Sequence, residues 1–153
     1  MKFRRALIGA LVTLMAAVGA VAVASPASAA PAICNALGFP SGRDVYIDNN
    51  DNGGGAFVSA NLCWKSNGNG YYDTFVEWTV TDTEANGAGA TIRMEWTGTD
   101  GDTHYYVPEA SQRAWTAWAT ADGEFARGNI KGLYVRACLT NTNSPGHHCG
   151  AKY

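Results

Sequence analysis

Hydrophobic and polar residues alternate along much of the chain after residue 40, which is the period-2 pattern of strands with one buried face. Residues 71–82 form the longest such run, and residues 91–97 repeat the pattern. The predicted core faces are Tyr72, Thr74, Val76, Trp78 and Val80 in the first run, and Ala90, Ile92, Met94 and Trp96 in the second. These two strands are the best-defined elements that the sequence predicts.

Loops rich in Asn, Asp and Gly divide the rest of the chain after residue 40 into further short strands. The pattern predicts strands at residues 43–48, 56–64, 102–107 and 130–139, and it favours a strand over a helical turn at residues 114–119. Residues 121–129 are predicted to be a loop. Short strands at this spacing indicate an all-β fold, an antiparallel β-sandwich of roughly seven to eight strands.

The turns predict how neighbouring strands align. Asn86-Gly87 is a strong hairpin signal, but a two-residue turn there would place Trp78 opposite Glu95 and mix the core and solvent faces. A longer loop or a bulge is therefore expected to bring Trp78 opposite Met94 or a neighbour two residues away. A two-residue turn at residues 100–101 would place Trp96 opposite Tyr105 and Glu95 opposite Tyr106.

This alignment predicts one polar outer face on the central strands. It would carry Glu77, Arg93, Glu95, Thr97, His104 and Tyr106. Two carboxylates one strand apart are what a glycosidase uses. A flat outer face has no cleft to raise one pKa, however, so a water-facing surface with Arg93 beside a glutamate is the preferred interpretation, with no catalytic residues.

The N-terminus has the pattern of a signal peptide. Three basic residues precede an apolar run from residue 6 to 24, and small residues follow with a predicted cleavage after Ala29. Residues 30–153 then form a single secreted domain. Removal of the signal peptide would lower the number of Lys and Arg residues from 11 to eight, against 13 Asp and Glu, which gives residues 30–153 a net charge of about −5. Such a domain is not expected to bind nucleic acid, or membranes after signal cleavage.

The mature part contains four cysteines, Cys34, Cys63, Cys138 and Cys149. An even number in an exported chain predicts two disulfides. Three pairings are possible. Cys34 with Cys63 and Cys138 with Cys149 is preferred, because the second bond closes a short loop and the first ties a loose N-terminal arm to a strand.

Two segments have the composition of metal sites. Residues 48–53 resemble the start of a calcium loop, but the twelfth position is Ser59 where such a loop needs a glutamate. His147 and His148 precede a cysteine that is expected to be oxidised, with no third ligand nearby. Neither a metal nor a cofactor is predicted.

Aromatic residues supply candidates for binding. Trp115 and Trp118 lie in a weakly patterned segment, where at least one of them could be exposed. Exposed tryptophans anchor protein partners or stack on sugars, and filling of the core is an equally favoured role.

Residues 132–138, a polar loop and then Cys149 resemble the closing strand of small secreted proteins of filamentous actinobacteria. The alanine-rich signal and Leu62-Cys63-Trp64 agree with this resemblance. Some such proteins are adaptor subunits of umbrella toxin particles. The resemblance implies a disulfide-linked β-sandwich that joins a repeat-bearing scaffold to a lectin.

The sequence thus predicts a secreted, non-enzymatic adaptor for extracellular protein partners. A carbohydrate-binding module is the first alternative, and a small secreted glycosidase is the second. The predicted partner-binding residues are Trp115, Trp118, Arg93, Glu95 and Tyr106.

Overall fold

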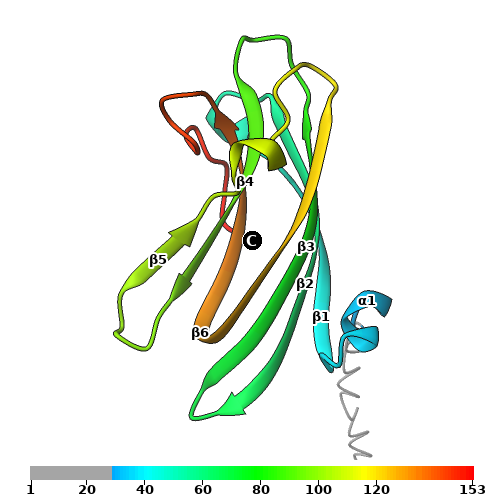
Figure 1. The fold of residues 1–153 in the computed structure, drawn as a ribbon, viewed down its shortest axis with the longest axis vertical. Helices are drawn as coiled ribbons and strands as arrows, with labels where there is room; N and C mark the ends of the chain where they lie inside the picture. Colours follow the sequence, from blue (N-terminus) through cyan, green and yellow to red (C-terminus); the bar gives the residue numbers. More distant parts are fainter. Residues whose placement is uncertain (1–28) are drawn as a thin grey trace, which may run out of the picture.

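The computed structural model describes residues 29–153 (Figure 1). The predicted signal peptide, except for Ala29, lies outside the described residues. Within residues 29–153, no helix is long and apolar enough to cross a bilayer.

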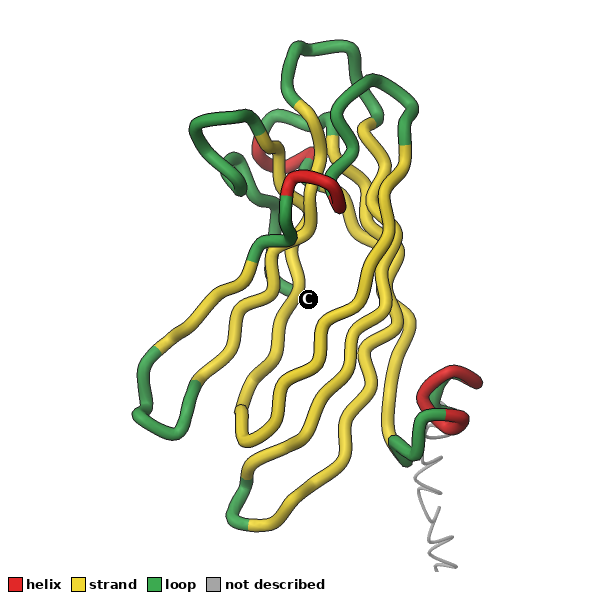
Figure 2. Tube along the Cα trace, viewed as in Figure 1, coloured by secondary structure: helices red, strands yellow, loops and turns green. Residues whose placement is uncertain are grey.

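Antiparallel strands make up most of the described chain. Their sheet order is β1-β2-β3-β6-β4-β5 (Figures 1 and 2). The elements are α1 (Ala32–Ala36), β1 (Ser41–Asp48), β2 (Ala56–Gly68), β3 (Tyr71–Asp82), β4 (Gly89–Thr97), β5 (Thr103–Tyr106) and β6 (Thr120–Thr140), with 3₁₀ turns at Asn50–Asn52 and Ala110–Gln112. The all-β prediction is confirmed, and the described residues contain six strands.

β6 holds the two halves of the sheet together. Its first part, residues 120–130, pairs with β3, and its second part, residues 131–140, pairs with β4. Between them Asn129 and Gly132 have left-handed backbones, with φ of 55° and 56°, and the chain reverses its direction (Figure 2). The prediction of a loop at residues 121–129 was therefore wrong. Small and polar residues hid this strand, and one of them, Gly123, lies opposite Trp78 and against its ring.

A single core lies between β1–β3 on one side and β4 with the second part of β6 on the other. The predicted inward faces of β3 and β4 are confirmed at Val76, Trp78, Ile92 and Met94, which are all fully buried. Tyr72, which was predicted on the same face, is 38% exposed at the start of β3. Burial of these side chains supplies the main free energy that stabilises the fold.

β3 and β4 do not pair with each other, so the expected alignment of Trp78 with Met94 was wrong. Trp78 lies between Ala60 of β2 and Gly123 of β6, whereas Met94 lies between Tyr106 of β5 and Val135 of β6. The two strands belong to opposite sides of the core. Alternation identifies the inward face of a strand, but it does not distinguish a neighbour alongside from one across the core.

The turn between β4 and β5 also differs from the prediction. It contains five residues, closed by a 3.0 Å hydrogen bond from the Gly98 N–H to the Asp102 carbonyl. Asp100 Oδ1 accepts a further 3.0 Å bond from the Asp102 N–H. Glu95 consequently lies opposite Tyr105, not Tyr106. A shift of one residue exchanges the faces of a strand, so Tyr106 points inward.

Both preferred disulfides are present, Cys34–Cys63 and Cys138–Cys149, and the described residues contain no free cysteine. Two disulfides are consistent with an extracellular protein. The expected strand at residues 114–119 was wrong. Only Ala114 makes a β-bridge, to Ala90, and a turn follows it.

Candidate binding face

The outer side of β5, β4 and the second part of β6 carries two rows of side chains in register. Tyr105, Glu95 and Tyr134 align across three strands, and Arg93 aligns with Arg136 in the neighbouring row. Lys152, from the segment after β6, joins them through an ion pair with Glu95. We call this surface, made of Arg93, Glu95, Tyr105, Tyr134, Arg136 and Lys152, the Glu95 face.

Glu95 lies at its centre and contacts three cations. Its side chain is only 5% exposed. Oε1 accepts hydrogen bonds from Nε of Arg93 at 2.7 Å, from Nη2 of the same residue and from Arg136 Nη1 at 3.3 Å. Oε2 lies 2.5 Å from Lys152 Nζ. One carboxylate against three cations leaves a local charge of about +2 on a chain that is acidic overall.

These contacts determine the protonation state of Glu95. Burial by itself raises the pKa of this carboxyl group, but the hydrogen bonds and positive charges of Lys152 and Arg93 outweigh it and lower the pKa from 4.5 to about 2. Glu95 is therefore ionised at any pH near neutrality. A carboxylate in this state has no proton to give as a general acid, and its lone pairs are already engaged by cations.

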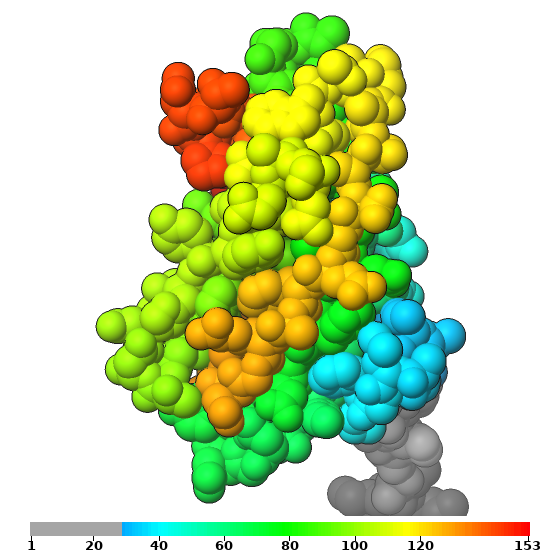
Figure 3. Space-filling view, in the orientation of Figure 1, coloured from blue at the N-terminus to red at the C-terminus, as the bar shows by residue number. Residues whose placement is uncertain are grey.

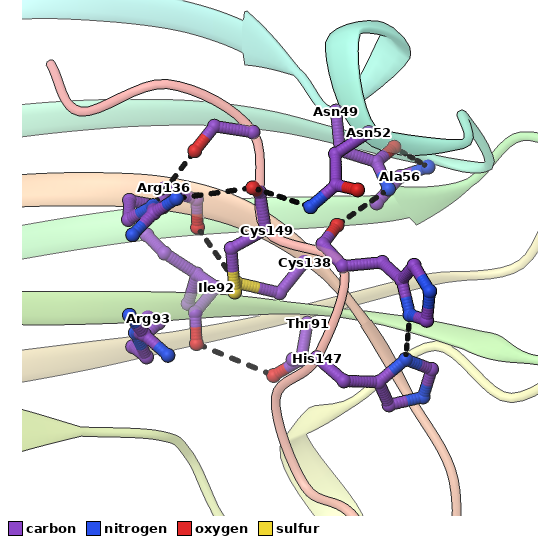
Figure 4. The surroundings of a disulfide bond; sticks show 12 residues. Asn49, Asn52, Ala56, Thr91, Ile92, Arg93, Arg136, Cys138, His147 and Cys149 are labelled. Carbon is purple, nitrogen blue, oxygen red and sulfur yellow. Dashed lines mark hydrogen bonds between the residues drawn. A yellow bond between two sulfur atoms is a disulfide. The ribbon is translucent and has the colours of Figure 1, made fainter.

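The C-terminal segment lies along the edge of this face and supplies Lys152, one of the three cations packed against Glu95. Residues 147–153 run antiparallel to β6, with paired backbone bonds between Leu139 and His147 and between Val135 and Tyr153. Arg136 donates to the carbonyl oxygens of Gly150 at 2.7 Å and Cys149 at 3.0 Å (Figure 4). The Cys138–Cys149 disulfide fixes the start of the same segment.

The Asn-rich loop between β1 and β2 holds the segment from its other side. Asn49 is fully buried; its Oδ1 accepts from the Ala56 N–H at 2.9 Å, and its Nδ2 donates to the His148 carbonyl at 3.0 Å. Asn52 donates to the Cys149 carbonyl at 3.2 Å (Figure 4). These amides of the loop that resembles a calcium site thus contact protein groups. Residues 29–153 contain no group of three or more His, Cys, Asp or Glu side chains placed to hold a metal.

Two exposed tyrosines flank the buried carboxylate. Tyr105 is 70% exposed and Tyr134 is 44% exposed. The Arg93 guanidinium lies 5.6 Å from the Tyr105 ring centre, and Lys152 Nζ lies 5.9 Å from that of Tyr134. Cations over aromatic rings restrict both partners, so the face is a preorganised platform of rings and positive charge.

The structure brings together only part of the predicted partner-binding set. Arg93 and Glu95 meet as predicted, but Glu95 is buried instead of water-facing, because the side chains of three cations pack against its carboxylate. Tyr106 packs inward, with its ring centre 5.2 Å from that of Phe125. Sequence reasoning missed Tyr105, Tyr134, Arg136 and Lys152. Alternation along residues 130–139 already placed Tyr134 and Arg136 opposite the apolar face, whereas nothing marked Lys152.

Glu77 and Glu95 lie on opposite outer sides of the protein. Glu77 aligns with Asn61 and Glu124 on the outer face of β2, β3 and β6, between the buried Val76 and Trp78. The core separates it from Glu95, so these two carboxylates cannot act on one glycosidic bond.

Trp115 and Trp118 lie in the segment that connects the 3₁₀ turn at Ala110–Gln112 to β6. This segment forms part of the surface at one end of the protein (yellow in Figure 3). Trp115 is 40% exposed and donates from Nε1 to the Ala110 carbonyl at 2.7 Å, whereas Trp118 is 74% exposed. Neither tryptophan belongs to the Glu95 face.

No family model, no curated protein and no solved structure matches this chain.

Proposed function

We propose that the protein is a secreted, non-catalytic adaptor that binds protein partners in an extracellular assembly. One observation carries this proposal: two exposed tyrosines flank a buried carboxylate that three cations hold in place. Tyrosine and arginine are the residues that most often supply binding energy at protein interfaces. The protonation state of Glu95 also favours binding over acid-base catalysis.

The arrangement of strands supports the sandwich that the proposal assumes. The two parts of β6 behave as separate strands, because each pairs with a different neighbour. Residues 147–153 bond to β6 as a further strand would. We infer a β-sandwich with four strands on each side, which is a rigid support for binding surfaces.

The resemblance to umbrella toxin adaptors gives this proposal a more specific form, in which the partners are a repeat-bearing scaffold and a lectin. Secretion of the chain belongs to the same proposal. It is supported by the signal-like N-terminus and by the two disulfides.

Capture of partners from culture supernatant of the producing organism tests the Glu95 face. The immobilised domain is expected to retain a protein in stoichiometric amount, and Tyr105→Ala with Tyr134→Ala is expected to weaken this capture at least about tenfold. Tyr46→Ala is the matched control, because Tyr46 is 69% exposed on the opposite outer face.

Two results would contradict the proposal. An equal loss of capture in the Tyr46→Ala control would show that the Glu95 face has no specific role in binding. Retention of the wild-type domain on cellulose, chitin or peptidoglycan, without any protein partner, would favour the carbohydrate-binding alternative.

A further inference from the structure

A groove opens between the two sides of the core, near the reversal in β6. Its walls are apolar: Leu62 and Trp64 come from β2, Tyr72 from β3, and Ile130 and Leu133 from β6. Its volume is about 250 Å³. Leu62 and Ile130 are buried, whereas Trp64 and Leu133 are half-buried and Tyr72 is exposed, so the groove joins the core to the surface.

Two cations line the same groove. Arg43 from β1 and Lys131 from β6 are both exposed, and neither forms an ion pair with any residue in the range 29–153. Lys131 Nζ lies 4.3 Å from the ring centre of Tyr71. The groove therefore combines an apolar interior with positive charge at its mouth.

We propose that this groove receives one aromatic side chain of a protein partner, with acidic residues beside that side chain in the partner's sequence. The inference rests on the proposed function, because it takes the occupant from a protein partner. The groove is a surface distinct from the Glu95 face. Leu133 lines it, whereas the next residue, Tyr134, belongs to the Glu95 face.

The size of the groove favours a single anchor side chain. Pockets for drug-sized ligands usually have volumes of roughly 300–1,000 Å³, so this groove lies below that range. A large aromatic side chain fills such a space and can stack on the rings of Trp64 and Tyr72. Anchors of this kind, seated in preformed pockets, supply much of the binding energy of protein interfaces.

The charge at the mouth favours acidic neighbours. An aspartate or glutamate next to the anchor would reach Arg43 or Lys131 at the surface, since neither side chain donates a hydrogen bond to any residue in the range 29–153. Such surface pairs add selectivity and speed of association more than affinity. They also discriminate against a basic segment, because like charges at the mouth repel it.

Fluorine NMR with three blocked tripeptides tests the inference on the full domain. The probes carry 5-fluorotryptophan between two aspartates, 5-fluorotryptophan between two lysines, and fluoroalanine between two aspartates. The first should bind with a dissociation constant on the order of millimolar, at least about fivefold more tightly than either of the others. Tyr72→Ala should weaken its binding, since it removes one wall of the groove.

Charge reversal provides the sharper comparison. Arg43→Glu with Lys131→Glu should make the lysine-flanked probe the tighter ligand. Lys65→Glu with Arg127→Glu makes the same change of net charge at exposed positions outside the groove, and it should preserve the wild-type order.

Three results would overturn the inference: no binding of the aspartate-flanked tryptophan probe, equal binding of all three probes, or reversal of their order by the control pair as well. Binding of free indole-3-acetate as tightly as the first probe would also overturn it, in favour of a small-molecule site. The Tyr105→Ala and Tyr134→Ala variant should bind the probes normally. Failure of the groove would thus leave partner capture by the Glu95 face intact, and the reverse also holds.

Discussion

Lys152 Nζ lies 2.5 Å from Glu95 Oε2, so an ion pair joins the C-terminal segment to the middle of β4. Arg136 strengthens this connection, because it contacts Glu95 through Nη1 and the carbonyl oxygens of Cys149 and Gly150 through Nη2 and Nε. One carboxylate thus links β4, β6 and the segment beside them.

Stability is expected to depend on pH through Glu95. Its pKa is lowered from 4.5 to about 2 in the folded protein, so the unfolded chain takes up the proton first as the pH falls. The contribution of Glu95 should be complete above pH 4.5 and disappear as the pH falls to about 2. Urea unfolding at a series of pH values measures it.

Glu95→Gln should lower the free energy of unfolding at pH 7 by about 3 kcal/mol, and the difference from wild type should shrink toward pH 2. Glu77→Gln is the control, because Glu77 forms no ion pair within residues 29–153. A constant difference at every pH would show that Glu95 contributes through packing and not through its charge.

The Cys138–Cys149 disulfide is expected to hold the C-terminal segment in place. Its cysteines lie 11 positions apart in the sequence, and replacing both with Ala should cost about 2–4 kcal/mol. Hydrogen exchange of the Gly150 and Tyr153 amides, which bond to β6, should accelerate in advance of global unfolding. Replacement of Cys34 and Cys63 should also destabilise the protein but leave the relative protection of these two amides unchanged.

Trp118 combines high exposure with a strained backbone, since its φ is 69°. Trp118→Gly should therefore maintain or raise the melting temperature, because glycine avoids a cost of about 1 kcal/mol in the left-handed region. If Trp118 binds a partner as the sequence predicts, capture should fall at least about tenfold. A lower melting temperature with normal capture would contradict both statements.

Gly123 is expected to tolerate no side chain. A Cβ atom there would lie 2.5 Å from Trp78 Cζ2 and 2.6 Å from Gln112 Nε2. Gly123→Ala should cost about 3 kcal/mol or prevent folding, because the indole ring is held in the core. Asp122→Ala, at the exposed neighbouring position, should leave stability nearly unchanged in thermal unfolding.

Individual strands were predictable because alternation reports directly on burial. β3 was predicted with its observed bounds, and the inward faces of β3 and β4 followed from their apolar residues. The disulfide pairing was predicted from the segments that the bonds close. Cys138–Cys149 closes a short loop, and Cys34–Cys63 ties the loose N-terminal arm to a strand. Which strands pair was not predictable, because partners alongside and across the core satisfy the same pattern.

The Glu95 face was only partly predictable. Arg93 and Glu95 are two residues apart on one strand, so alternation placed them together. Tyr105 was assigned to the inward face because the sequence predicted a two-residue turn. The turn in the structure contains five residues and is closed by the Gly98–Asp102 bond, with a further bond from the Asp102 N–H to Asp100, so Tyr105 points outward. Lys152 reaches Glu95 only because backbone hydrogen bonds hold the residues after Cys149 beside β6. No periodic pattern in the sequence predicts those bonds.

The double pairing of β6 also determines how the chain can fold. Its first part bonds to β3, between residues that are 39 to 58 positions apart, and its second part bonds to β4, between residues that are 34 to 51 positions apart. Such non-local contacts cost loop-closure entropy before they contribute stabilising energy, which makes folding slow. Neither side of the core has its full set of strands until residues 120–140 have arrived, so a chain truncated before residue 120 leaves the apolar faces of β3 and β4 without their shared neighbour. A chain synthesised from its N-terminus therefore completes its core only when residues 120–140, within its last quarter, are available.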